Sequence, residues 1–148
     1  EKVVRTSEIP VLVIKNEHKK FKVKDFVFAS DFKDESKEPY KNAIKFAEAL
    51  GAKMHLLMVN TPTKFVTSGK ANSRMEKFAN GFDFKKYTLN IYNDTSIEKG
   101  IMNFSQAITA DLIGMSTHGR QGISHFFNGS ISEDLVNHAK RPVITFKI

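Results

Sequence analysis

The residues best suited to chemistry lie in the stretch from Ile113 to Ile131. An apolar run there gives way to a loop that contains Gly119 and Gly129, and Ser130 follows, three residues before Glu133. This pattern is typical of a strand, a glycine-bearing loop and a helix that opens with a Ser-x-x-Glu capping box. Such a junction leaves backbone N–H groups unpaired at the positive end of a helix dipole, where they can bind a phosphate. The stretch therefore predicts a nucleotide site, although a simple tight connection is the alternative because neither a Walker A motif nor Gly-x-Gly-x-x-Gly occurs.

A second group suited to ligand binding is the carboxylate of Asp31, which closely follows the apolar run Phe26–Ala29. At the end of a strand it could accept a hydrogen bond from a base amino group or a ribose hydroxyl while the loop amides hold phosphates. An Asx turn or a helix N-cap is the alternative role, and the residues alone do not separate the two. Asp111 stands at the other end of its strand and is not expected to join this site.

Five apolar runs, separated by segments of helical period, would have to position these groups. The strands are expected at Phe26–Ala29, Met54–Val59, Tyr87–Tyr92, Asp111–Met115 and Val143–Phe146. This alternation predicts an α/β fold of three layers, with a doubly wound parallel five-stranded sheet of order 3-2-1-4-5 and helices on both faces. In that arrangement the strand order reverses between the first and fourth strands, so Asp31 and the glycine loop should share the ligand-binding edge.

Local signals add detail to the helical segments. One helix is expected to end at Gly51, a favourable residue after a C-terminus, and Thr61–Lys70 is predicted to be a loop. Thr95 and Glu98 have the spacing of a capping box. Gly100 lies inside the helix that follows, where glycine costs about 1 kcal/mol relative to alanine, so it is expected to allow a close packing contact.

The composition is that of one domain. A chain of 148 residues, of which 41% are hydrophobic, can bury a core. There are no cysteines, which excludes disulfides and thiolate metal sites and fits a cytoplasmic location. The apolar runs are well below the roughly 18 residues of a membrane span, so no membrane partner is expected.

The net charge of +7 raises the question of nucleic-acid binding. Lysines and arginines are spread over the whole chain without a basic stripe interleaved with aromatic residues, which favours a solvated surface and no nucleic-acid partner. The thirteen phenylalanines mostly fall at core-like spacings and are interpreted as packing. His118, His125 and His138 lack metal-ligand spacing, so no metal site is expected.

An internal repeat links the two ends of the chain. Residues 1–15 align without gaps on residues 133–147, and both copies have the pattern of a short helix, a break marked by proline and a buried strand. A spacing of 132 residues is the size of a domain. We therefore expect residues 1–15 to be the remnant of a preceding related domain, 16–24 a linker and 25–148 the main domain. A chance similarity is the alternative.

The residues past the fourth strand resemble a known family motif. The run Met115-Ser116-Thr117-His118-Gly119, nine intervening residues and then Gly129-Ser130 resemble the universal stress protein family, whose ATP-binding members carry Gly-x-x-Gly, nine residues and Gly-Ser/Thr. The similarity covers 25–148, and Asp31 matches the aspartate after the family's first strand. The first motif glycine is Ser116 here, and the proline two residues before the aspartate is Ala29. The resemblance also implies that residues 1–15 are the end of the first domain of a tandem protein of this family.

This resemblance implies an adenine-nucleotide site. Asp31 and Val59, with Ala29 nearby, would hold the adenine. The ribose and phosphates would be lined by Met115, Ser116, Gly119, Gly129, Ser130 and Ile131, with Arg120 beside the phosphates. Ser116 would weaken phosphate binding if the family glycine is needed for a positive φ or a close approach, and its hydroxyl could otherwise add a donor.

Three functions remain open at this point. The first is a stress-response module that binds ATP or another adenine nucleotide, with or without Mg²⁺, and acts through ligand-dependent conformation or association. The second is a nucleotide-free dimerisation scaffold, which Ser116 favours. A slow ATPase or phosphotransferase ranks last, because no clear Mg²⁺-binding carboxylate or general base stands beside the glycine loop. Family domains pair through their last strands, so Val11–Lys15 should lie antiparallel to Val143–Lys147, in cis or from the second copy of a homodimer.

Overall fold

The chain is built on a six-stranded sheet in a computed structural model that describes residues 11–13, 22–117 and 141–148. The strands lie in the order β1-β6-β5-β2-β3-β4, and all pairs are parallel except the antiparallel pair of β1 and β6. Counted along the chain from β2, the five parallel strands have the order 3-2-1-4-5, which confirms the predicted fold class. Their bounds are β1 (Val11–Val13), β2 (Asp25–Ala29), β3 (Lys53–Asn60), β4 (Tyr87–Asn93), β5 (Leu112–Thr117) and β6 (Val143–Lys147).

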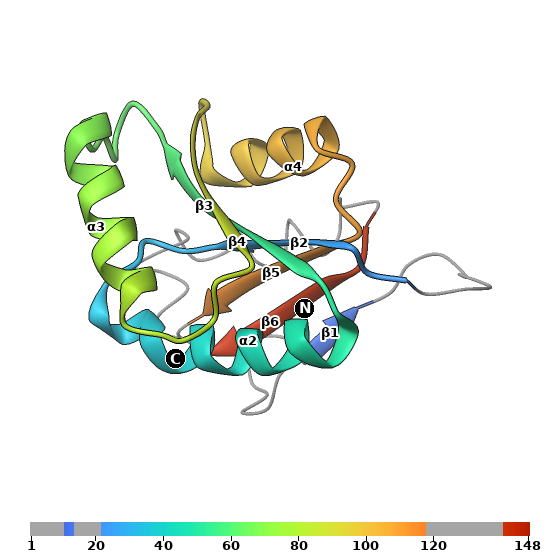
Figure 1. Cartoon of the computed structure of the whole chain (residues 1–148). Coiled ribbons are helices and arrows are strands. Elements are labelled where there is room, and N and C mark those ends of the chain that lie inside the picture. The colour runs from blue at the N-terminus through green and yellow to red at the C-terminus, as the bar shows by residue number, and fades with distance from the viewer. Residues whose placement is uncertain (1–10, 14–21, 118–140) are drawn as a thin grey trace.

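Helices cover both faces of the sheet (Figure 1). Phe26 and Phe28 of β2 pack on one face with buried residues of α2 and α3, whereas Val27 packs on the other face with buried residues of α4. Successive side chains of a strand point to opposite faces, so a continuous apolar run serves both layers of the core. The helices are α2 (Lys37–Leu50), which follows the short 3-10 helix η1 (Asp34–Ser36), α3 (Ser68–Asn80) and α4 (Ile97–Ala107).

Helix α2 follows directly from its sequence pattern. Tyr40, Ala43 and Ala47 have the three- and four-residue spacing of one helix face, and all three are fully buried. The helix ends where Gly51 adopts φ 65°, and the Gly51 N–H donates to backbone carbonyls of the last turn. A left-handed residue there costs little because glycine has no Cβ, so the predicted helix end is confirmed.

The starts of α3 and α4 differ from the sequence expectation by a few residues. Helix α3 begins at Ser68, inside the stretch Thr61–Lys70 that was expected to be a loop, because the Thr67 side chain caps it by accepting from the Lys70 N–H. The capping-box prediction at Thr95 is wrong by one residue, since Ser96 is the N-cap of α4 and accepts from the Lys99 N–H. Both N-caps have the extended backbone that this role requires.

The close packing contact expected at Gly100 is confirmed. Gly100 lies in α4 where the helix crosses β3, and a Cβ built on it would stand 2.4 Å from Cγ1 of Val59. That separation is far below van der Waals contact, so any side chain at Gly100 would have to displace Val59. The absence of a side chain therefore fixes how near α4 approaches the end of β3.

Strand β1 covers the outer edge of β6. Val11 pairs with Thr145, Leu12 with Ile144 and Val13 with Val143 in an antiparallel ladder. This pairing covers β6 and makes the three-residue strand β1 the end of the sheet, and very short edge strands limit association with other chains. The rest of the predicted remnant 1–15, most of the predicted linker 16–24, the glycine loop and the helix expected after it lie outside the described residues.

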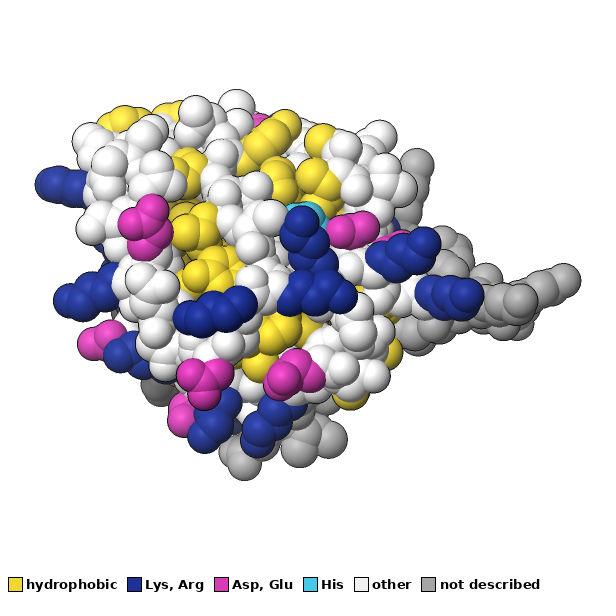
Figure 2. Space-filling view, in the orientation of Figure 1, with side chains coloured by type: hydrophobic (Ala, Val, Ile, Leu, Met, Phe, Trp, Pro, Cys, Tyr) yellow, Lys and Arg dark blue, Asp and Glu magenta, His cyan; other side chains and the backbone are white. Residues whose placement is uncertain are grey.

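The visible surface mixes charges and carries apolar side chains along its middle. Figure 2 shows lysines and arginines interspersed with acidic residues, and apolar side chains in front, where β4 runs. Partly buried side chains of this strand, among them Tyr87, Leu89 and Ile91, pack against the core. Within the described residues, no helix has the length and apolarity needed to cross a membrane.

Candidate functional site

A pocket of about 560 Å³ opens at the carboxyl ends of β2 and β3. This volume is in the range of small-molecule sites. It lies beside the point where the strand order of the sheet reverses, since β2 is flanked by β3 on one side and by β5 on the other. The lining residues are Ala29, Ser30, Asp31, Lys33, Glu35, Leu57, Met58, Val59, Asn60, Lys64, Phe65, Val66, Arg74 and Ile97.

Asp31 forms the Asx turn that was one of the two roles considered for it, and it also lines the pocket. Its Oδ1 accepts from the Lys33 N–H at 3.1 Å and from the Ser36 hydroxyl at 3.3 Å, which is an Asx turn leading into η1. Its Oδ2 has no hydrogen-bond partner among the described residues. Because an ionised carboxylate has about four lone-pair sites, the turn leaves acceptor capacity in the pocket.

The backbone next to Asp31 is held in an uncommon conformation. Phe32 has φ 56°, in the left-handed region, which costs a residue with a Cβ about 1–2 kcal/mol. Its N–H donates to the Ser30 hydroxyl at 3.0 Å, and its buried ring packs edge-on against Phe78 with centroids 5.3 Å apart. Strain of this kind persists where the surroundings over-determine it and is concentrated at functional sites. The turn thus holds Asp31 in a defined position.

The walls of the pocket differ in chemistry. Leu57 and Val59 of β3 and Ile97 at the start of α4 make an apolar wall. The rim carries three basic side chains, Lys33, Lys64 and Arg74, and two carboxylates, Asp31 and Glu35. Nη1 of Arg74 donates to the Asp31 carbonyl at 3.3 Å, which brings α3 to the end of β2. A planar apolar group with polar edges and a negative charge matches these surroundings.

The structure brings some of the predicted site residues together and not others. Ala29, Asp31 and Val59 line the pocket. Met115 and Ser116 are buried on β5, next to β2, and do not line it. The remaining predicted residues, Gly119, Arg120, Gly129, Ser130 and Ile131, lie outside the described residues.

Ser116 occupies its place without backbone strain. It belongs to the regular strand β5 and is not among the described residues with positive φ. It pairs with Phe146 of β6, and residues paired across neighbouring strands share a face of the sheet. Its side chain therefore points to the side of α2 and is 1% exposed. A positive φ, one of the two reasons for glycine at this position, does not apply here.

Sequence reasoning missed the rim of the pocket. Asn60, Phe65 and Arg74 were not expected to line a site. Asn60 had a detectable signal, because a polar residue directly after a buried strand stands at the ligand edge of a parallel sheet. Phe65 is an exception to the interpretation of phenylalanines as packing, since it is 70% exposed.

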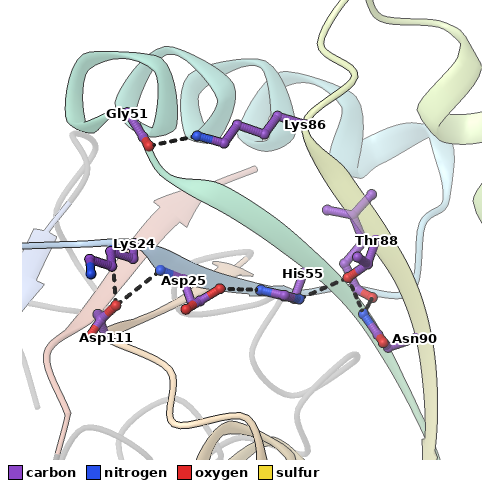
Figure 3. A network of polar contacts seen from close by, with 9 residues as sticks. Lys24, Asp25, Gly51, His55, Lys86, Thr88, Asn90 and Asp111 are labelled. Atoms are coloured by element: carbon purple, nitrogen blue, oxygen red, sulfur yellow. Dashed lines mark hydrogen bonds and ion pairs between the residues drawn. The ribbon is translucent and has the colours of Figure 1, made fainter.

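The opposite end of the sheet carries a polar network that is satisfied internally (Figure 3). The Asp111 carboxylate accepts from the backbone N–H of Lys24 at 2.9 Å and of Asp25 at 3.0 Å. His55 contacts Oδ1 of Asp25 through Nε2 and the Thr88 hydroxyl through Nδ1, both at 2.8 Å. Asp111 thus stays away from the pocket, as predicted. The described residues hold no cluster of three or more His, Cys, Asp or Glu side chains that could bind a metal.

Comparisons with known proteins point to one family. A family model described as the universal stress protein family matches residues 92–147. The universal stress protein MJ0531 of Methanocaldococcus jannaschii is 26% identical over 141 residues, which cover 84% of this chain and 82% of that protein. Both comparisons support a universal stress protein family for this chain.

Solved universal stress proteins share the fold. One from Archaeoglobus fulgidus DSM 4304 superposes with a TM-score of 0.73 at 21% identity, over 98% of this chain and 52% of that chain. This chain therefore spans about half the length of that structure. Another universal stress protein, solved in complex with cAMP, has a TM-score of 0.66 at 16% identity, over 84% of this chain and 97% of its own.

Proposed function

We propose that this universal stress protein domain is a stress-response module that binds ATP, AMP or another adenine nucleotide. The observation that carries the proposal is the pocket at the ends of β2 and β3. There, one carboxylate oxygen of Asp31 has no partner in the described part of the chain and lies beside the apolar wall of Val59. A relative of the same fold has been solved in complex with cAMP, which supports an adenine nucleotide as the ligand. We propose no catalytic step for the domain, which acts through ligand-dependent conformation or association.

The proposed pose puts the adenine at the pocket and the phosphates at the glycine loop. Oδ2 of Asp31 accepts from the adenine amino group, and Val59 contacts the ring. The chain leaves β5 toward the glycine loop, where amides of Gly119, Gly129 and Ser130 are proposed to hold phosphates, with Mg²⁺ if a triphosphate binds. Met115, Ser116, Arg120 and Ile131 complete the proposed site.

The second candidate is a nucleotide-free scaffold of the same family, and Ser116 is the residue that favours it. The scaffold is favoured if the replacement of the family's first motif glycine by Ser116 prevents phosphate binding. The regular strand geometry of Ser116 weakens this argument, because its φ is not positive and its side chain points to the side of α2. We therefore rank nucleotide binding above the scaffold.

Thermal unfolding of the whole chain with ATP, ADP, AMP and cAMP tests the proposal. A ligand that binds only the folded state stabilises it by about 2.7 kcal/mol when present at about 100 times its dissociation constant. We expect a concentration-dependent rise in Tm with at least one of these nucleotides and none with ribose. If millimolar concentrations of all four leave Tm unchanged, the scaffold is the better description.

We also propose that residues 1–15 come from a preceding related domain, joined by the linker 16–24 to the domain 25–148. The β1–β6 pairing supports this, because it joins the two copies of the internal repeat. Structures matched over 52–55% of their own length cover 98–99% of this chain, whereas two matched over 96–97% of their length cover 84–85% of it. In a homodimer, the strand that pairs with this edge of β6 would instead come from the second copy.

A further inference from the structure

Phe65 stands out among the described residues as a large apolar side chain left in solvent. It is 70% exposed, and it lines the pocket. A single exposed apolar residue on an open surface needs no explanation, but one at the mouth of a pocket is placed where a ligand would cover it. Its position between Lys64 and Val66, both also in the pocket lining, puts a whole short loop at the rim.

Hydrogen bonds hold this loop on both sides of Phe65. The buried side chain of Asn60 makes two bonds to the backbone of Val66: Nδ2 donates to the carbonyl at 2.9 Å, and Oδ1 accepts from the N–H at 3.0 Å. On the other side, the Lys64 N–H donates to the Thr61 carbonyl at 3.2 Å and to the Thr61 hydroxyl at 3.1 Å. The backbone that carries the exposed ring is therefore fixed before any ligand arrives, which lowers the entropic cost of binding.

The other lining groups suit the rest of a nucleobase. Val59 and Ile97 provide an apolar wall, and Asp31 provides an acceptor for an exocyclic amino group. Arg74 uses one of its five donors on the Asp31 carbonyl, which leaves further guanidinium donors at the rim. An aromatic ring beside such a pocket can stack on a planar base, because every base presents a π-face.

We propose that Phe65 is a base-stacking residue and that the loop from Asn60 to Val66 is an aromatic subsite selecting ligands that carry a nucleobase. This inference rests on the proposed function, because it names how the same pocket recognises the base of its nucleotide. It assigns to the loop after β3 a part of ligand recognition that is independent of the glycine loop.

The test compares AMP with ribose 5-phosphate by calorimetry, using the wild-type chain and the variants Phe65→Ala and Phe65→Tyr. Base stacking on an aromatic side chain is worth about tenfold or more in affinity. We expect Phe65→Ala to weaken AMP binding by about that factor, Phe65→Tyr to retain it, and neither to change the affinity for ribose 5-phosphate. The Tm of the unliganded variants should match that of the wild type, because the ring is exposed.

A fluorescence measurement gives a second readout. The chain contains no tryptophan, so Phe65→Trp introduces a single reporter at the rim, and Tyr87→Trp on β4 is the matched control at the other end of the sheet. AMP should quench the emission of Phe65→Trp with saturation, ribose 5-phosphate should not, and neither should affect Tyr87→Trp.

The outcomes separate this inference from the proposed function. If wild type and Phe65→Ala bind AMP equally, the stacking residue is wrong while the nucleotide site stands. If Phe65→Ala weakens ribose 5-phosphate as much as AMP, stacking on a base is also wrong. If the wild type binds no adenine nucleotide at millimolar concentration, the proposed function fails, and the inference fails with it.

Discussion

The two ends of the parallel sheet differ in how far their polar groups are hydrogen-bonded within the protein. At the amino ends, Asp25, His55 and Asp111 find partners within the protein, at 2.8–3.0 Å. At the carboxyl ends, Asp31 keeps one carboxylate oxygen without a partner among the described residues, and Phe65 exposes its ring. Groups satisfied by the protein contribute to folding, whereas groups left open at a pocket are suited to a ligand.

Topology explains why the open groups gather at one end. The connections that leave β2 and β3 lead to α2 and α3 on one face, and the packing of α4 builds the other face. The strand order reverses between β2 and β5, and ligands bind outside the carboxyl ends of the strands near such a point. At the amino ends, the side chains of Asp25, His55 and Thr88 bond across neighbouring strands, which leaves fewer groups open. The contrast predicts that substitutions at the two ends separate ligand affinity from stability.

Asp31→Asn should have the largest effect on ligand affinity. The amide keeps an oxygen for the Asx turn but replaces the open acceptor by a donor, so the bond to an adenine amino group is lost. A hydrogen bond to a charged group is worth about 1.5–3 kcal/mol, which corresponds to about 10–150-fold in the dissociation constant for AMP. Calorimetry measures the affinity and urea unfolding the stability, which should change by less than about 1 kcal/mol. An unchanged AMP affinity would contradict the assignment of Asp31 to the site.

His55→Ala should show the reverse pattern. It removes the ring that joins Asp25 to Thr88, while Thr88 keeps the bond donated by Asn90, so the loss is about 0.5–1.5 kcal/mol of unfolding free energy. AMP affinity should stay within about twofold, because the network lies at the other end of the sheet. His55→Gln is the control, since an amide can retain one of the two bonds and should lose less. A drop in AMP affinity as large as that of Asp31→Asn would contradict the expected separation of ligand affinity from stability between the two ends of the sheet.

Gly100→Ala should affect both properties at once. The added Cβ meets Val59, a pocket residue, at 2.4 Å, and overpacking of this kind costs about 1–3 kcal/mol, offset in part by the better helix propensity of alanine. Displacement of Val59 should also weaken AMP binding several-fold. The double variant Gly100→Ala with Val59→Ala should recover part of the stability, and a double-mutant cycle measures the coupling. Additive effects within about 0.5 kcal/mol would argue against this contact.

Tyr40→Phe should have the smallest effect and should be stabilising. The Tyr40 hydroxyl is buried with no hydrogen-bond partner among the described residues, and its removal should raise the unfolding free energy by about 1 kcal/mol. Burial, with a smaller contribution from Tyr87, raises the pKa of Tyr40 well above its ordinary value. A raised folded-state pKa stabilises the protein below the unfolded pKa of about 10, and this contribution is lost as pH rises beyond it. The stability of Tyr40→Phe should therefore fall less than that of the wild type above about pH 10, as measured by urea unfolding; an equal fall would show that Tyr40 titrates normally.

The local signals of the sequence sufficed for the elements and their order. Apolar runs separated by segments of helical period indicated the strands, and the burial of Tyr40, Ala43 and Ala47 follows from helical spacing. Gly51 and Gly100 were also interpretable, because a helix end and a close helix contact both depend on the missing Cβ. The N-cap at Ser96 in place of Thr95 shows the limit of such signals, since neighbouring residues with similar side chains compete for one cap.

The sequence by itself therefore determined the fold class, the sheet order and the edge at which Asp31 and Val59 meet. The tertiary structure alone decided the rim of the pocket. Arg74 reaches the Asp31 carbonyl from 43 residues away, and Asn60 holds the backbone of Val66 so that Phe65 stays exposed. Periodicity and caps are properties of neighbouring residues, so they can be interpreted along the chain. Exposure and long-range contacts depend on how the layers pack, and an aromatic residue has the same local pattern whether its ring is buried or left open for a ligand.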